Sequence, residues 1–139
     1  MNYISAEEFL KQPVEVQKVF KDWWKPQKGD LYAPHEFSNM VRCLECDGKS
    51  EGVIANPEVK DKIFPLLTEC QLRQFIEDKT GCKIETVWIS STPEYYITLV
   101  DNKDSNIIIR NYFDLGEDLL QAYWKVAIEI AEEEQKEHR

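Results

Sequence analysis

Residues 114–131 read Asp114-Leu-Gly-Glu-Asp-Leu-Leu-Gln-Ala-Tyr-Trp-Lys-Val-Ala-Ile-Glu-Ile-Ala131, and the expected fold is organised around this stretch. Its apolar residues recur at steps of three and four, which places them on one side of a helix with 3.6 residues per turn. One stripe comprises Leu119, Ala122, Tyr123, Val126, Ala127, Ile130 and Ala131, and a second comprises Leu120, Trp124 and Ile128. More than half of the helix surface is therefore expected to be covered, as for a long helix laid across a sheet.

Three segments rich in β-branched and aromatic residues precede this helix, at residues 84–90, 95–100 and 106–113. The connections at 91–94 and 101–105 are too short to contain a crossover helix, so consecutive strands must pair as antiparallel hairpins. The sequence thus predicts a three-stranded meander ahead of the long helix.

Helices are also expected near the N-terminus. Residues 5–8 form a Ser-x-x-Glu capping box, with Ile4 and Phe9 spaced to make a hydrophobic contact across the start of a short helix. A second helix is expected over residues 14–24, because Pro13 either interrupts the first helix or occupies the first turn of the next.

A further helix is predicted in the middle of the chain. Residues 68–71 read Thr-Glu-Cys-Gln, a second capping box, and a helix over residues 69–79 follows it. Leu67 is placed to make the flanking apolar contact, and Gly81 supplies the expected end.

The region between Pro34 and Pro65 has a weaker pattern, in which residues 40–46 and 53–55 could pair as a hairpin. The predicted fold class is α+β: an antiparallel sheet, made of the meander with or without this N-terminal hairpin, is covered by helices. The long C-terminal helix lies across one face. A length of 139 residues fits one domain, over residues 1–139.

Composition narrows the classes of function. The formal net charge of −9 disfavours direct binding to nucleic-acid backbones, which needs a surplus of Lys and Arg on one face. No apolar run is long enough to cross a membrane, and no export signal is recognisable at the N-terminus. A soluble, cytoplasmic protein with reduced cysteines is therefore expected.

The acidic run Glu132-Glu133-Glu134 near the C-terminus is expected to be a solvated helix end. Acid at this end opposes the helix dipole, so fraying beyond Ala131 is expected. The alternative is that the acidic helix mimics nucleic acid and inhibits a DNA-binding protein of the host, which would require carboxylates at the spacing of duplex phosphates.

A resemblance extends over most of the chain. The segments 24–30 and 64–76, together with the ending 118–128, resemble uncharacterised small proteins encoded by phages and prophages of Gram-positive bacteria. The resemblance implies an accessory protein with a helix, an antiparallel meander and a final Ala-rich helix. It implies no catalytic residue.

A zinc site is the alternative reading of the cysteines. Cys43 and Cys46 have the Cys-x-x-Cys spacing that lets two thiolates bind one zinc ion, and His35 and Cys82 are the candidates for the remaining ligands. A structural site needs four such ligands, and no second close pair occurs. Four reduced thiols, with no bound cofactor, are the favoured interpretation, with Cys70 as a helical boundary residue.

No catalytic residue is assigned. A Cys or Ser nucleophile needs a base within reach, and only His35 and His138 could serve. The sequence contains neither a P-loop nor a Gly-x-Gly-x-x-Gly motif. An exposed Trp23 or Trp24 with Tyr32 could instead anchor a protein contact, although both tryptophans are expected to be mostly buried.

The function expected from the sequence is that of a non-enzymatic accessory protein that binds another protein. The expected partner is a host factor or a second copy of the chain, so the protein is either a monomer or a homodimer. The alternatives are a zinc-supported binding or enzymatic domain built on Cys43 and Cys46, and the acidic nucleic-acid mimic.

Overall fold

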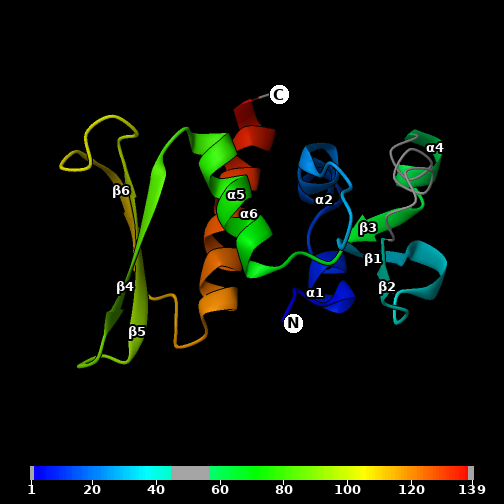
Figure 1. The fold of residues 1–139 in the computed structure, drawn as a ribbon, viewed down its shortest axis with the longest axis horizontal. Coiled ribbons are helices and arrows are strands. Elements are labelled where there is room, and N and C mark those ends of the chain that lie inside the picture. The colour runs from blue at the N-terminus through cyan, green and yellow to red at the C-terminus, as the bar shows by residue number, and fades with distance from the viewer. Residues whose placement is uncertain (1, 45–56, 138–139) are drawn as a thin grey trace. The chain divides into compact units, whose positions relative to one another are not determined.

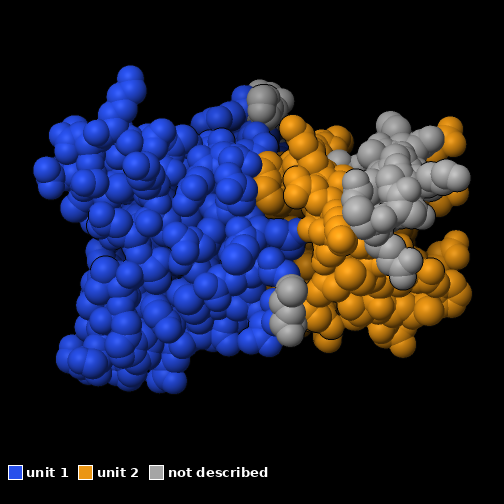
Figure 2. All heavy atoms as spheres, viewed as in Figure 1, with its two compact units in different colours: residues 1–2, 68–139 blue, residues 3–67 orange. Residues whose placement is uncertain are grey.

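The computed structural model describes residues 2–44 and 57–137. The chain divides into two compact units, which Figure 2 colours separately. Unit 1 comprises residues 1–2 and 68–139, and unit 2 comprises residues 3–67. Each unit contains a three-stranded antiparallel sheet together with helices, which confirms the predicted α+β class. One domain over residues 1–139 stays a prediction, and the structure describes two compact units that each have a sheet.

Unit 2 contains the N-terminal helices and a small sheet. Its elements are α1 (Ala6–Leu10), α2 (Val14–Trp23), β1 (Leu31–Pro34), the short 3-10 helix η1 (His35–Phe37), β2 (Arg42–Cys43), α4 (Pro57–Lys60) and β3 (Ile63–Pro65). The strand order is β2-β1-β3.

The pairing in this sheet differs from the predicted hairpin. Strand β2 lies inside the predicted strand 40–46, but it pairs with β1, in the register Leu31↔Cys43. The predicted partner, residues 53–55, lies outside the described residues. Strand β1 also pairs with β3 through Ala33↔Phe64, so β1 is the central strand of this sheet. Pairing partners thirty residues apart leave no local sequence signal.

The predicted N-cap residue of α1 is confirmed. Ser5 Oγ accepts a hydrogen bond from the backbone N–H of Glu8 at 3.2 Å, and both Ile4 and Phe9 are buried. The Phe9 ring stacks on that of Phe64 with centroids 5.4 Å apart, so the helix start is fixed to strand β3. Pro13 precedes α2 as its cap residue.

Unit 1 contains the meander and two helices. Its elements are α5 (Glu69–Thr80), β4 (Lys83–Ile89), β5 (Glu94–Val100), β6 (Ile108–Tyr112) and α6 (Leu119–Glu137). The strand order β4-β5-β6 confirms the predicted meander. Helix α5 begins with the predicted capping box of Thr68 and Gln71, and it ends at Gly81 in the left-handed conformation, with φ +68°.

Both helices of unit 1 lie on one face of the meander (Figure 1). Thr86 on β4 and Tyr123 on α6 share a hydrogen bond between their hydroxyl groups, which identifies the covered face. Cross-strand partners share a face, so Ile97 and Leu99, both buried, belong to it as well. The core of unit 1 lies between this face and the two helices.

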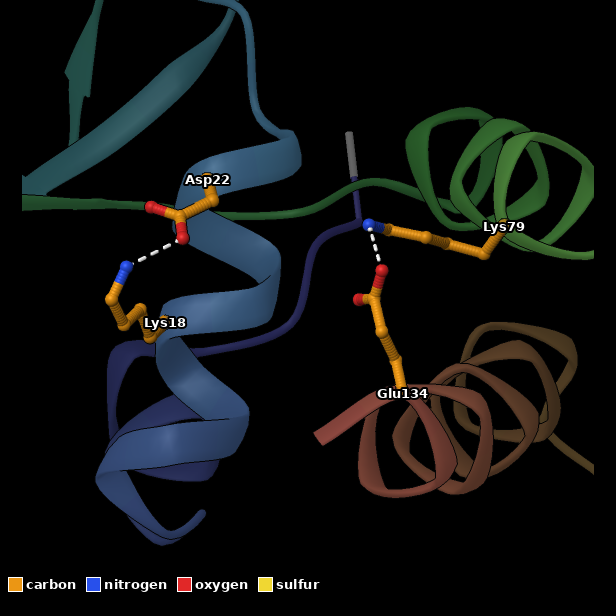
Figure 3. A network of polar contacts seen from close by, with 4 residues as sticks. All are labelled: Lys18, Asp22, Lys79 and Glu134. Carbon is orange, nitrogen blue, oxygen red and sulfur yellow. Dashed lines mark hydrogen bonds and ion pairs between the residues drawn. The ribbon is translucent and has the colours of Figure 1, made fainter. Parts of the chain in front are cut away.

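Helix α6 continues well past the point where fraying is expected. Its last described helical residue is Glu137, and two residues of the acidic run are paired with cations of the same unit. Glu134 Oε1 accepts from Lys79 Nζ at 2.8 Å (Figure 3), and Glu133 accepts from the Arg110 guanidinium. The prediction of fraying beyond Ala131 was wrong because it considered only the helix dipole. Attraction to cations on α5 and β6 outweighs that small repulsion.

Substitution of Trp124 tests whether the packing of α6 is central to the core of unit 1. Its side chain is only 3% exposed, so we expect Trp124→Ala to lower the free energy of unfolding by about 3–5 kcal/mol, through lost burial and the cavity left behind. Replacing Glu132, exposed on the same helix, with Ala should change it by less than about 0.5 kcal/mol. Urea denaturation measures both values. Wild-type stability of the Trp124→Ala variant would contradict this assignment.

Candidate functional site

The face of the meander that points away from α5 and α6 is the candidate site, and we call it the open face (Figure 1). The strand register assigns to it Lys83, Glu85, Val87 and Ile89 from β4, Glu94, Tyr96, Thr98 and Val100 from β5, and Ile108 and Asn111 from β6. Phe113 joins them just beyond β6, because its ring makes an edge-to-face contact with Tyr96 at 4.7 Å between centroids.

Large apolar side chains on the open face are exposed to solvent. Val87 is 46% exposed, Ile108 59% and Phe113 53%. They lie on or next to the two edge strands, and the Tyr96 ring on the central strand is partly buried beside Phe113. A β-bulge at Leu99 and Val100 aligns Ile108 with Val100 and so keeps Ile108 on this face. The apolar side chains of the open face therefore fall into two groups. The polar row of Glu85, Thr98 and Asn111 separates Ile108, which lies beside the buried Val100, from Val87, Tyr96 and Phe113.

The polar groups in the middle of the open face satisfy each other. Thr98 Oγ1 donates to Asn111 Oδ1 at 2.9 Å across the β5–β6 pair. The charged side chains of the open face are Lys83 at one end, Glu94 at the other end, and Glu85, which lies directly opposite Thr98 on edge strand β4. The row formed by Val87, Tyr96 and Phe113 carries no charge, so covering this row would require little desolvation of polar groups.

The pattern of the sequence did not indicate that these residues form a site. A sheet with one face in water shows clean alternation of apolar and polar residues, whereas residues 107–109 are three consecutive isoleucines. Val87 and Trp88, adjacent on β4, are both apolar as well, and both are about half exposed. Consecutive apolar residues in a strand lie on both of its faces. This pattern is the signal that could have indicated a second apolar face on the sheet.

The aromatic residues that the sequence suggested as a protein contact, Trp23, Trp24 and Tyr32, lie in unit 2 and are more buried than the half-exposed apolar residues of the open face. Trp24 is only 1% exposed, and its indole Nε1 donates to Asp30 Oδ2 at 3.0 Å. It packs in unit 2 with Leu44 and Ile63, and partly buried Trp23 and Tyr32 pack against this cluster. The expectation that Trp24 is mostly buried is confirmed, since its ring contributes to the core of unit 2, and this burial rules out the alternative of Trp24 as an exposed protein contact.

The cysteine and histidine candidates do not form a metal cluster among the residues that the structure describes. Cys43 is exposed on β2 and Cys82 is partly buried after α5, while Cys46 lies outside the described ranges. The Cys43–Cys46 zinc site therefore stays a prediction. Cys70 is exposed on α5.

His35 is the base candidate that the structure describes. Its Nε2 atom lies 3.3 Å from Lys21 Nζ, and its ring packs edge-to-face against Phe64 at 4.9 Å between centroids. Partial burial, followed by the Lys21 charge, lowers the pKa of His35, so the neutral imidazole is favoured. Neither contact is with a Cys or Ser nucleophile. His138 lies outside the described residues.

A hollow of about 310 Å³ in unit 1 lies beside the end of α6. Its lining includes the two ion pairs Lys79–Glu134 and Arg110–Glu133. The Arg110 guanidinium also lies over the Tyr112 ring, 4.8 Å from its centroid. Pairing within the unit reduces the number of carboxylates that this helix end could present as a mimic of duplex phosphates.

Comparison with models of protein families, with curated proteins and with solved structures finds no match to the chain. Among the described residues, no helix combines the length and the apolar composition that crossing a membrane requires.

The Tyr112 side chain, which lines this hollow, allows a test of how strongly burial affects a titratable group there. Its buried hydroxyl has no hydrogen-bond partner among the described residues, and burial raises its pKa to about 12. Because the folded state holds the proton more tightly than an unfolded tyrosine near pH 10, this contribution to stability is present below pH 10 and is lost as the pH rises towards 12. We expect Tyr112→Phe to change stability by less than about 1 kcal/mol at pH 7.

The same variant should lose less stability than the wild type between pH 10 and 12. Denaturation of both proteins across this range measures the difference, and comparison with the wild type cancels the titration of other groups. Parallel stability curves for the two proteins would show that Tyr112 ionises normally.

Proposed function

We propose that this chain is a non-enzymatic protein-binding module and that the open face is its contact surface. The proposal rests on one observation: half-exposed Val87, Ile108 and Phe113 share a face of the meander that no described element of unit 1 covers. Scattered apolar residues are normal on a protein surface, whereas a contiguous patch of about 300–600 Å² is often functional.

The chemistry of the open face favours a protein partner over a small ligand. The face is an exposed sheet surface, whereas small molecules bind in concave pockets that surround most of their area. Aromatic and aliphatic anchors surrounded by polar groups are typical of protein contacts. Phe113 with Tyr96 supplies the aromatic part, and Lys83 and Glu94 lie at the ends.

A phage or prophage accessory role, with a host factor among the candidate partners, is proposed on the sequence resemblance alone. It is compatible with binding through an exposed sheet face. A protein of this kind acts through occupancy of a partner surface, so it needs no catalytic group.

Capture experiments with matched variants test the role of the open face. Affinity-tagged protein is incubated with lysate of a Gram-positive host, and co-purifying proteins, including untagged copies added to the lysate, are quantified by mass spectrometry. We expect Phe113→Asp and Ile108→Asp to reduce a specifically captured protein about tenfold or more, because each places a charge within an apolar part of the open face.

Phe37→Asp is the matched control. Phe37 is a phenylalanine with nearly the same exposure, 56%, but it lies in η1 of unit 2. This variant should capture the same proteins as the wild type. Equal capture by all four proteins, or no specific capture at all, would contradict the proposed function.

A further inference from the structure

We infer that the open face binds a second copy of this chain, so that two meanders pack face to face about a two-fold axis. The inference rests on the proposed function and names the partner of the same surface. Three features carry it: the charge of the face, the arrangement of its charged ends, and its area.

The charge of the open face differs from that of the whole chain. The strands contribute Lys83, Glu85 and Glu94 to this face, a net charge of −1, whereas the chain carries −9. Two copies repel each other over most of their surfaces, so a self-contact needs a region where charge is sparse. The row of Val87, Tyr96 and Phe113, which lies between the row of Glu85 and the end that carries Glu94, meets this condition.

The charged ends make the face complementary to itself. Lys83 pairs in register with Val100 at one end of the β4–β5 ladder, and Glu94 pairs with Ile89 at the other end. A two-fold axis that lies between the sheets and runs across the strands places each end of one copy over the opposite end of the other. Lys83 of each copy then faces the end that carries Glu94 in the second copy.

The alternative two-fold axis, parallel to the strands, is disfavoured by the same charges. It would stack like ends on each other and bring the two Glu94 side chains together, and like charges across an interface are costly. Glu85 belongs to edge strand β4, from which its carboxylate can reach solvent at the rim. The charge pattern therefore selects one of the two symmetric arrangements.

The area of the open face predicts a weak dimer. Strands β4 and β5 have seven residues each, so three strands at about 3.4 Å per residue and about 4.8 Å spacing cover roughly 23 by 14 Å. With its side chains, such a face buries about 400–500 Å² per copy, which is less than the roughly 800 Å² per partner of a standard specific interface and in the range of weak, transient contacts. We expect a reversible dimer with a Kd of about micromolar or weaker.

Sedimentation velocity of the purified full chain, from about 1 to 300 µM, tests this inference. The wild type and Phe37→Asp should shift from monomer to dimer with increasing concentration. Phe113→Asp and Ile108→Asp should weaken the dimer about tenfold or more while their circular dichroism spectra stay like that of the wild type. Two variants at separate positions guard against a folding defect in one of them.

Charge reversal tests the two-fold arrangement. Lys83→Glu and Glu94→Lys should each weaken the dimer, because each puts like charges opposite one another, and the double variant should restore it. Failure of restoration would overturn the proposed axis. A wild type that stays monomeric at 300 µM, or a dimer insensitive to Phe113→Asp and Ile108→Asp, would overturn self-association through this face.

The two proposals fail in distinguishable ways. A monomeric wild type that still captures a foreign protein, with capture lost in Phe113→Asp, leaves the open face as a binding surface and removes the second copy as its occupant. A monomer that captures nothing through this face removes both.

Discussion

The packing of α6 and α5 against one face of the β4–β5–β6 meander is the interaction on which the rest of unit 1 depends. Three strands form a stable sheet only when at least one face is buried, and the apolar sides of the helices supply that burial. Seven residues of α6 are buried, including Tyr123 and Trp124. Helices on one face leave the other face without a layer from the same unit, so the open face follows directly from this architecture.

Electrostatics limits how this acidic chain can use its surfaces. Arg110 on β6 pairs with Glu133, and Lys79 on α5 pairs with Glu134. These two ion pairs connect the end of α6 to strand β6 and to helix α5. Surface ion pairs contribute little to stability individually, but these pairs orient carboxylates that would otherwise repel one another. The open face carries few charges, so it is suited to contact with another protein. The acidic remainder of the surface repels other acidic surfaces.

The two candidate contact regions of the chain have different physical roles. In unit 2, Trp24 is buried with Leu44 and Ile63, and the hydrogen bond from its indole to Asp30 satisfies its one polar group. In unit 1, Phe113 and Ile108 remain half exposed although they belong to the same residue classes. Residue type therefore does not identify which apolar residues stay exposed; the number of layers that cover each side of a sheet does.

The sequence by itself determined the local elements: the meander, the N-caps of α1 and α5, the end of α5 at Gly81 and the apolar stripes of α6 are recorded in periodicity and in turn residues. The β2-β1-β3 order, the full length of α6 and the site on the open face were decided by tertiary structure. Each depends on residues distant in sequence, such as Ala33 with Phe64 and Lys79 with Glu134. A strand pattern predicts two faces, but only packing decides which face the helices cover.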